Sequence, residues 1–139
     1  MSTPGSTRLV RTLRFALLLA GMAWLPLSQA QVAPTAAETA TYRGLHAAAA
    51  RGDVAALTQL LSAKANINQR DAYGRTPLHV ATFAKHRAAM RALIQAGADT
   101  GALENDRYDA VTIAAVADDE ETLRTLLGLG ASAKLVTSR

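Results

Sequence analysis

The sequence predicts an all-α solenoid built from three helix-pair units with extended connecting loops, and three observations lead to this prediction. A similar pattern begins at Arg43, Thr76 and Asp109, so the same offset of 33 residues separates each copy from the next without a gap. Within each copy, aliphatic residues recur at positions i, i+3 and i+4, which is the pattern of a helix with one buried side. The copies are rich in alanine, a strong helix former, and aromatic residues make up only 4% of the chain.

The three copies keep the same kind of side chain at matching positions, aliphatic with aliphatic and alanine with alanine. One helix pair cannot bury its own apolar side, whereas stacked copies can, and about three are the usual minimum. We therefore expect one continuous apolar seam through Leu60, Leu93 and Leu126. Further matching sets are Leu45, Leu78 and Val111; Ala48, Ala81 and Ala114; and Leu57, Met90 and Leu123.

The start of the first helix in each unit is predicted from the stretch GRTPLHVA, residues 74–81. The hydroxyl of Thr76 can accept a hydrogen bond from a free N–H group of the first turn. Pro77 then falls at the first helical position, where its missing N–H has no cost. Asp109 takes the place of Thr76 in the third unit and can cap a helix equally well.

The end of the second helix in each unit is marked by small or unusual residues. Gly97 and Gly130 stand where a left-handed residue is expected to close the helix. Lys64 has the same place in the first unit. Because it is not a glycine, we expect the left-handed conformation to cost it about 1 kcal/mol of stability. Arg107 takes the place of the turn glycine Gly74, so we expect the third loop either to differ in conformation or to be strained.

Residues 1–30 have the pattern of a secretory signal peptide. Three arginines and no acid precede an unbroken apolar run, residues 15–25, and small residues follow at Ser28 and Ala30. We expect cleavage after Ala30, although a retained membrane anchor is the alternative. The apolar run is shorter than the roughly 20 residues that span a bilayer, which favours cleavage.

The organisation expected after cleavage is a short lead-in followed by one repeat domain. The lead-in covers residues 31–41 and the repeat domain residues 42–139. The units lie at about 38–70, 71–103 and 104–134. A periplasmic or secreted protein, with no membrane attachment after cleavage, is the localisation that follows.

The charge and cysteine content exclude several classes of function. The chain has 15 Lys and Arg against 11 Asp and Glu, and three of the arginines lie in the predicted signal peptide, which leaves 12 against 11. A nucleic-acid-binding protein needs a clustered basic surface, so we expect no nucleic-acid partner. The chain has no cysteine, so an exported protein would have to be stable from the packing of its side chains alone, without disulfide bonds.

The oligomeric state that we expect for this protein is a monomer.

The repeat unit resembles the ankyrin repeat, because it combines the 33-residue period with G-x-TPLH-x-A, a leucine pair and GAD. The resemblance covers roughly residues 38–134, and together with the predicted signal peptide it suggests a short exported bacterial member of that family. It implies stacked helix pairs and a concave surface, formed by loop tips and the exposed sides of the first helices, that binds proteins. The second unit carries the motif almost in full: Asp71, Gly74, Thr76, Pro77, Leu78, His79, Ala81, Leu93, Gly97, Ala98 and Asp99.

The histidines and acidic residues are the candidates for catalysis or metal binding. His46 and His79 occupy equivalent positions, and the resemblance implies that each imidazole hydrogen-bonds to backbone near its own loop. His86 opens a second helix and is expected to be exposed or to act as a cap. The acidic run 118–121 lies at the start of a predicted helix, where negative charge is favourable. We therefore expect no catalytic residue, no bound metal and no cofactor, and the protein is predicted not to be an enzyme.

The resemblance places the partner-binding positions at the loop tips and on the first helices. Tyrosine and arginine are common anchors of protein interfaces, which favours this interpretation over chance. The expected function is a non-catalytic module that binds a partner protein; the alternative is a dedicated accessory or protective factor for one exported enzyme or membrane complex. The predicted contact residues are Tyr42, Arg51, Tyr73, Arg75, Phe83, Asn105, Asp106 and Tyr108.

Overall fold

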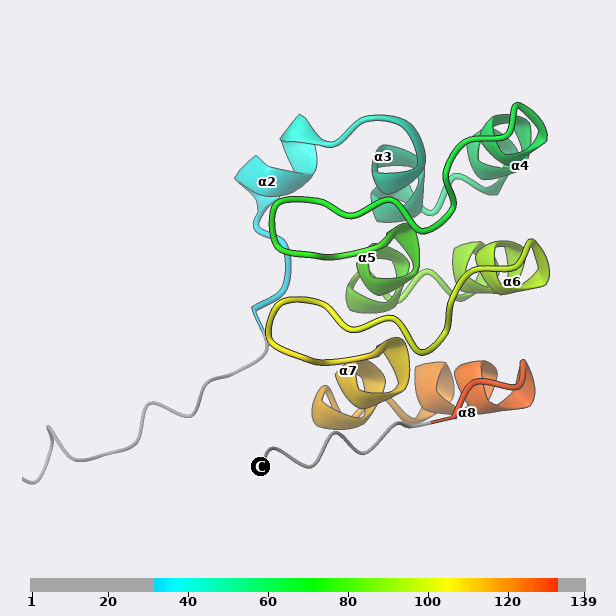
Figure 1. Ribbon diagram of the computed structural model, residues 1–139. Helices are drawn as coiled ribbons and strands as arrows, with labels where there is room; N and C mark the ends of the chain where they lie inside the picture. Colours follow the sequence, from blue (N-terminus) through cyan, green and yellow to red (C-terminus); the bar gives the residue numbers. More distant parts are fainter. Residues whose placement is uncertain (1–31, 133–139) are drawn as a thin grey trace, which may run out of the picture. The chain divides into compact units, whose positions relative to one another are not determined.

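The computed structural model describes residues 32–132, which fold into seven helices and contain no β-strand (Figure 1). The predicted signal peptide, residues 1–30, lies outside the described residues. The helices are α2 (Ala36–Thr41), α3 (Gly44–Arg51), α4 (Val54–Ser62), α5 (Pro77–Phe83), α6 (Arg87–Gln95), α7 (Ala110–Val116) and α8 (Glu120–Gly128).

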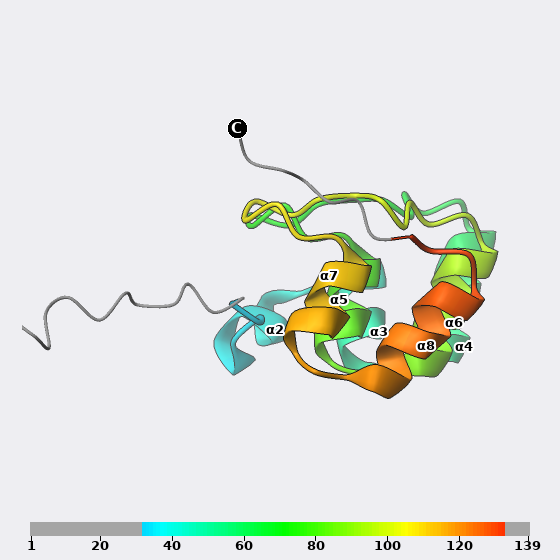
Figure 2. The same ribbon diagram turned by 90° about the horizontal axis from the view of Figure 1, so that it is seen from below.

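The helices of the repeats form two parallel rows, which confirms the all-α solenoid. The inner helices α3, α5 and α7 stack in one row, and the outer helices α4, α6 and α8 stack in the second (Figure 1). Long loops connect each outer helix to the next inner helix and extend to one side of the stack (Figure 2). We call the side of the stack that is formed by the loops and the inner helices the concave surface.

The predicted caps are present at the inner helices. The Thr76 hydroxyl accepts a hydrogen bond from the His79 N–H, and Pro77 is the first residue of α5. The Asp109 carboxylate accepts a hydrogen bond of 2.7 Å from the Thr112 N–H at the start of α7. Both inner helices therefore begin where the sequence predicted, because their starts are decided by local chemistry.

The apolar seam passes through all three units. Leu93 and Leu126 are completely buried, and Leu60 packs against the same core while remaining partly exposed. Leu60 lies on the first outer helix, α4, in which Leu57 is the completely buried leucine. Ala48, Ala81 and Ala114, at the matching positions of the inner helices, are at most 1% exposed.

Left-handed residues recur with the repeat. Gly97 and Gly130 have φ values of 99° and 91°, as expected, and Lys64 has a φ of 60° at the matching position. Arg107 has a φ of 68°, close to the 72° of Gly74, so the third loop keeps the conformation of the second and carries the strain. A second set of left-handed residues was not predicted. It consists of Gly52, Lys85 and Asp118, which follow the inner helices and have φ values of 68°, 59° and 53°.

Candidate functional site

The loops of the second and third units are joined side by side at their tips. The Asn105 N–H donates a hydrogen bond of 3.0 Å to the Tyr73 carbonyl, and its side-chain amide donates one of 3.4 Å to the Ala72 carbonyl. Gly74 lies so close to Asn105 that a side chain there would clash. These contacts make one continuous ridge of the two loop tips.

Each loop is also closed by an acidic residue at its base. The Asp71 carboxylate accepts hydrogen bonds of 2.8 Å from the Tyr73 and Arg75 N–H groups. Glu104, 33 residues later, accepts one of 2.9 Å from the Tyr108 N–H. The loop tips are therefore held by their own side chains, so a partner would meet a preformed surface.

The buried histidines hold the connecting loops to the inner helices. His46 Nε2 lies 2.8 Å from the Arg75 carbonyl, and His79 Nε2 lies 2.8 Å from the Ala102 carbonyl. The expected hydrogen bond to backbone is confirmed. His46 reaches the loop of the next unit, whereas His79 reaches a residue near the end of its own unit, 71–103.

His79 has a fixed tautomer. Its Nδ1 accepts a hydrogen bond of 2.9 Å from the Thr76 N–H, so the proton lies on Nε2, which donates to the Ala102 carbonyl. Burial lowers the pKa of His79 below its usual range. Because both ring nitrogens are engaged, the imidazole has no lone pair with which to bind a metal or take a proton from a substrate.

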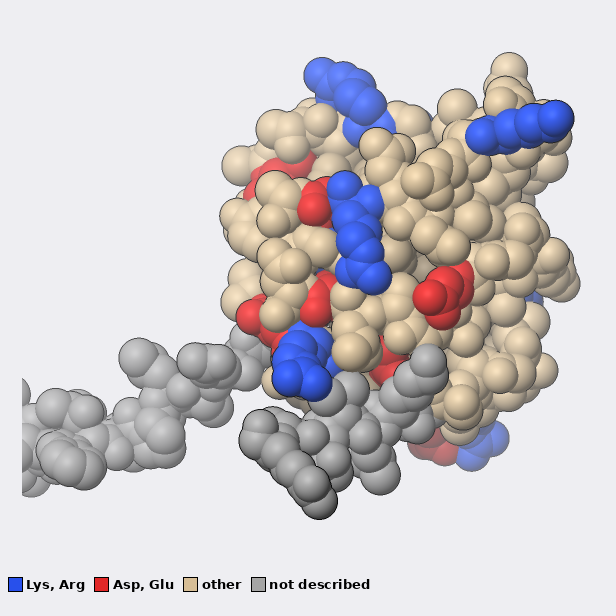
Figure 3. Space-filling view, viewed as in Figure 1, with Lys and Arg blue, Asp and Glu red and all other residues tan. Residues whose placement is uncertain are grey.

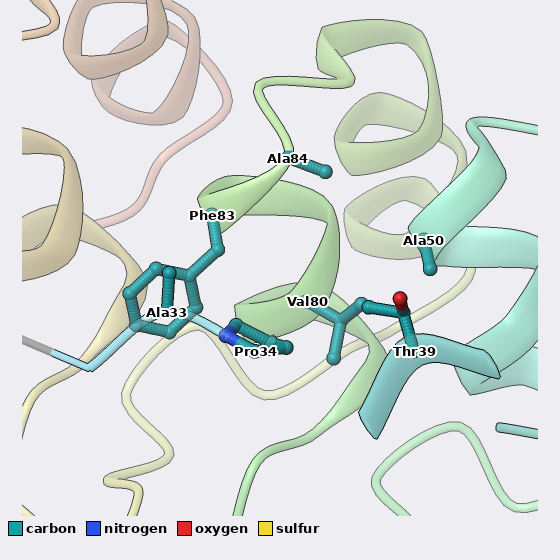
Figure 4. Close-up of a pocket in the computed structure, with 7 residues that line it drawn as sticks. All are labelled: Ala33, Pro34, Thr39, Ala50, Val80, Phe83 and Ala84. Carbon is teal, nitrogen blue, oxygen red and sulfur yellow. The ribbon is translucent and has the colours of Figure 1, made fainter. Parts of the chain in front are cut away.

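The concave surface of the first two units is covered by the chain itself. Residues 32–41, which we call the N-terminal segment, include α2 and lie beside the inner helices beneath the loops (Figure 2). Ala33, Pro34 and Thr39 of this segment line a pocket together with Val80 and Phe83 of α5 (Figure 4). The expectation of an open concave surface is therefore wrong for this part of the molecule.

Arg75 is buried beneath the N-terminal segment and is only 1% exposed. Its guanidinium group lies over the ring of Tyr73, at 4.4 Å from the centroid, and 5.8 Å from the centroid of Phe83. Nη1 is 3.7 Å from carboxylate oxygens of both Glu38 and Asp71. The sequence predicts Arg75 as a contact residue on an open surface, and in this arrangement its side chain instead contacts the protein itself.

The five residues Glu38, Asp71, Tyr73, Arg75 and Phe83 form a unit, which we call the Arg75 cluster. The interaction of the Tyr73 hydroxyl with the Glu38 carboxylate is the main cause that raises the pKa of Tyr73 and lowers the pKa of Glu38. The cluster thus connects a loop tip, an inner helix and the N-terminal segment.

Tyr42 supports the base of the same loop. Its hydroxyl donates a hydrogen bond of 2.7 Å to Asp71, and its ring lies 5.3 Å from the imidazole of His46. Desolvation, followed by the hydrogen bond to Asp71, raises the pKa of Tyr42 to about 12. Tyr42 is half-buried, so most of its contacts are within the protein.

The other predicted contact residues are divided between exposed and half-buried positions. Tyr73 is 46% exposed, and Arg51, Asn105 and Asp106 are also exposed. Phe83 and Tyr108 are half-buried, so only part of each ring is accessible. The structure brings Tyr73 and Asn105 together on the ridge, whereas Arg51 lies at the far end of α3.

Among the features of the surface, the helix of the N-terminal segment was not predicted from the sequence. The N-terminal segment begins its helix with a capping box, in which Thr35 and Glu38 each accept a hydrogen bond from the other's backbone N–H. The T-x-x-E spacing is a signal for this helix. Val116 is 57% exposed at the position of α7 that matches Phe83 of α5.

The acidic run 118–121 has a structural role at the start of α8. The Asp119 carboxylate accepts hydrogen bonds from the N–H and the hydroxyl of Thr122, which lowers the pKa of Asp119. Glu120 pairs with Arg124, and Glu121 with Arg87. The capping explanation is confirmed for Asp119.

Residues 32–132 contain neither a metal-binding cluster nor a membrane-spanning helix. No group of three or more His, Asp or Glu side chains in that range could hold a metal ion, and none of its helices is long and apolar enough to cross a membrane. Figure 3 shows acidic and basic side chains interspersed over the face that carries the loops, without one dominant basic patch.

Comparisons with known proteins agree with this architecture. A family described as ankyrin repeats (3 copies) matches residues 45–137. Inversin from Gallus gallus is 32% identical over 84 residues, covering 60% of this chain and 8% of inversin. The ankyrin repeat domain-containing protein SAT10 from Stachybotrys chartarum is 34% identical over 93 residues, covering 67% of this chain and 5% of that protein.

A solved ankyrin-repeat structure has the same fold as this chain. The crystal structure of the human ASB11 ankyrin repeat domain superposes with a TM-score of 0.60 at 29% identity, covering 68% of this chain and 42% of that domain. The chain thus spans only a small part of the curated relatives it matches. The match of the family over three repeats, together with the stacked helix pairs, shows that the chain belongs to the ankyrin-repeat family.

Proposed function

We propose that this protein is a non-catalytic module that binds another protein through the ridge of loop tips and the exposed end of α7. The observation that carries this proposal is the exposure of Tyr73 and Val116, at 46% and 57%. Ankyrin repeats serve as protein-binding scaffolds, and the ankyrin-repeat family matches residues 45–137 of this chain.

The ridge has the properties of a preformed interface. Tyr73 offers a large ring, and the backbone beneath it is fixed by hydrogen bonds to Asp71 and Asn105. A rigid aromatic residue loses little entropy on binding and is a common anchor of interfaces. Asn105 and Asp106 would supply polar contacts at the rim.

The choice of this surface also follows from where exposed apolar residues lie. Among the described residues, four large apolar side chains are exposed, at Val32, Tyr73, Val116 and Leu127. Val32 lies in the N-terminal segment, Tyr73 on the ridge and Val116 at the end of the inner helix α7, whereas Leu127 lies on the outer helix α8. Leu127 is therefore a suitable matched control.

The proposed location is the periplasm or the extracellular space, after removal of residues 1–30. The support for it is the basic, apolar and small-residue pattern of those thirty residues. Cell fractionation of the native host with N-terminal sequencing of the protein tests it. We expect a chain that begins at Gln31 in the periplasmic or secreted fraction; a chain in the cytoplasm with an intact N-terminus would contradict the proposal.

The binding surface is tested by site-specific crosslinking in the native host. A photoreactive phenylalanine is placed at Tyr73 or Val116, and at Leu127 as the control, followed by mass spectrometry of the crosslinked products. We expect the same partner protein from the first two positions and none from the third. Equal yields of that partner from all three positions, or crosslinks from Leu127 alone, would exclude the ridge as the binding surface.

A further inference from the structure

The N-terminal segment contacts the concave surface without becoming part of the core. None of the residues of α2 is buried, and only Glu38 and Thr39 within this helix are half-buried. The segment lies before the part of the chain that the ankyrin-repeat family matches, residues 45–137, and ends before the first inner helix begins. Because its own burial is small, little of the free energy of folding depends on it, and it can leave while the repeats stay folded.

The segment is attached mainly through Arg75. Arg75 Nη2 donates a hydrogen bond of 2.7 Å to the Val32 carbonyl, and Glu38 approaches Nη1 at 3.7 Å. Among the described residues, Nε and Nη1 have no hydrogen-bond partner, although Arg75 is buried. A buried guanidinium group with unused donors is costly, so the segment satisfies this arginine only in part.

A ligand with a better-placed carboxylate would satisfy the same arginine more completely. The guanidinium group offers five donors and is suited to a carboxylate that binds through both oxygens. A pocket that shares Phe83 with the Arg75 cluster is lined by Ala50, Val80 and Phe83 and, on the side of the N-terminal segment, by the small side chains of Ala33 and Pro34 (Figure 4). The surface under the segment thus fits an acidic segment with small apolar side chains.

We propose that residues 32–41 are an intramolecular lid, and that a partner protein displaces it with an acidic helical segment whose carboxylate takes the place of Glu38 on Arg75. This inference rests on the proposed function and extends its binding surface across the first two units. Tyr73 links the two surfaces, because it belongs to the exposed ridge and also contacts Glu38 and Arg75. A partner that binds the ridge is therefore in contact with the lid.

The lid is tested without a partner, by thiol labelling of the mature full chain. The protein has no cysteine, so one introduced thiol is the only site of reaction. Val80→Cys reports on the pocket under the lid, where Val80 is 1% exposed, and Ala50→Cys is a second reporter in the same pocket. Leu93→Cys, completely buried between the outer helices, reports on unfolding of the repeats.

The Glu38→Lys variant is designed to open the lid, because it places a positive charge beside the guanidinium group of Arg75. We expect this change to raise the labelling rate of Val80→Cys by about tenfold or more and to leave that of Leu93→Cys unchanged. Glu120→Lys, the same change of charge on an exposed residue of α8, is the control and should affect neither rate. An unchanged rate at Val80→Cys, or an equal rise at both reporters, would overturn the lid.

The chemistry of the displacing partner is tested with a peptide of residues 32–42. A tethered segment has an effective concentration of the order of millimolar, so the free peptide is used in that range. We expect it to slow the labelling of Val80→Cys in the Glu38→Lys background, and expect the same peptide with Glu replaced by Gln to have a weaker effect. Equal effects of the two peptides, or no effect of either, would exclude an acidic ligand at Arg75. The labelling and peptide experiments do not require a partner from the host. A negative result in them would contradict the lid, whereas a negative result in the crosslinking experiment would contradict the proposed binding surface.

Discussion

The imidazole of His86 lies directly against Gly52 of the preceding unit. A Cβ atom on Gly52 would come within 2.7 Å of His86 Cγ, and His86 Nε2 is 3.1 Å from the carbonyl of Ala50. His86 stands at the start of α6 but its side chain makes no capping hydrogen bond there. The expectation that His86 would be exposed or would act as a cap is therefore wrong: it is half-buried and joins the second unit to the first.

Gly52→Ala is expected to destabilise the protein by roughly 2–5 kcal/mol. A left-handed conformation at φ 68° costs a non-glycine residue about 1–2 kcal/mol, and the collision with His86 adds about 1–3 kcal/mol. Gly44→Ala is the control, because Gly44 has a φ of 54° but a Cβ atom added there would meet no other atom within 4 Å. Urea unfolding measures both. Equal losses in the two variants would show that the contact with His86 has no energetic effect.

The repeats could be predicted from the sequence because their signals are local and periodic. Thr76, Pro77 and Asp109 start their helices through contacts within a few residues, and the seam through Leu93 and Leu126 follows from their spacing. The same kind of signal exists for α2, since Thr35 and Glu38 form a capping box, although only a lead-in was predicted for this part of the chain.

The environment of the candidate site could not be predicted from the repeat. Arg75 is buried by residues that lie 37 positions away at Glu38 and 43 positions away at Val32, outside the repeated part of the chain. A family pattern describes the positions that all repeats share, and position 75 is exposed or buried according to what lies against the stack. The left-handed Lys85 and Asp118 were missed because neither is a glycine.

Lys85→Gly is expected to stabilise the protein by about 0.5–1 kcal/mol. Lys85 has a φ of 59°, which glycine adopts without steric cost, and the relief exceeds the entropy that glycine loses on folding. The neighbouring Ala84 is right-handed, so Ala84→Gly should instead lose about 0.5–1 kcal/mol. Thermal unfolding of the two variants gives the comparison. A loss in both would mean that the conformation of residue 85 carries no strain.

His79 is expected to make the protein sensitive to mild acid. Burial lowers its pKa in the folded state below the ordinary 6.5, so the unfolded chain binds a proton that the folded chain does not. Stability is then complete above pH 6.5 and falls as the pH drops below that value. His79→Leu removes the titration but also two hydrogen bonds, so it should be roughly 1–3 kcal/mol less stable at neutral pH with a flatter acid profile. Urea unfolding across the acid range measures the slope, and an equally steep profile in the variant would contradict the assignment.

Tyr42 is expected to give the opposite dependence at high pH. Desolvation and the hydrogen bond to Asp71 raise its pKa from 10.0 to about 12, so the folded state keeps a proton that the unfolded state releases. The stabilising contribution is complete below pH 10 and is lost as the pH rises from 10 to 12. Tyr42→Phe should lose about 1 kcal/mol at neutral pH, because one partly exposed hydrogen bond disappears. Ultraviolet titration should show a group that ionises near pH 12 in the wild type, and the absorbance change of that group should be missing in Tyr42→Phe; an unchanged titration in the variant would contradict the assignment to Tyr42.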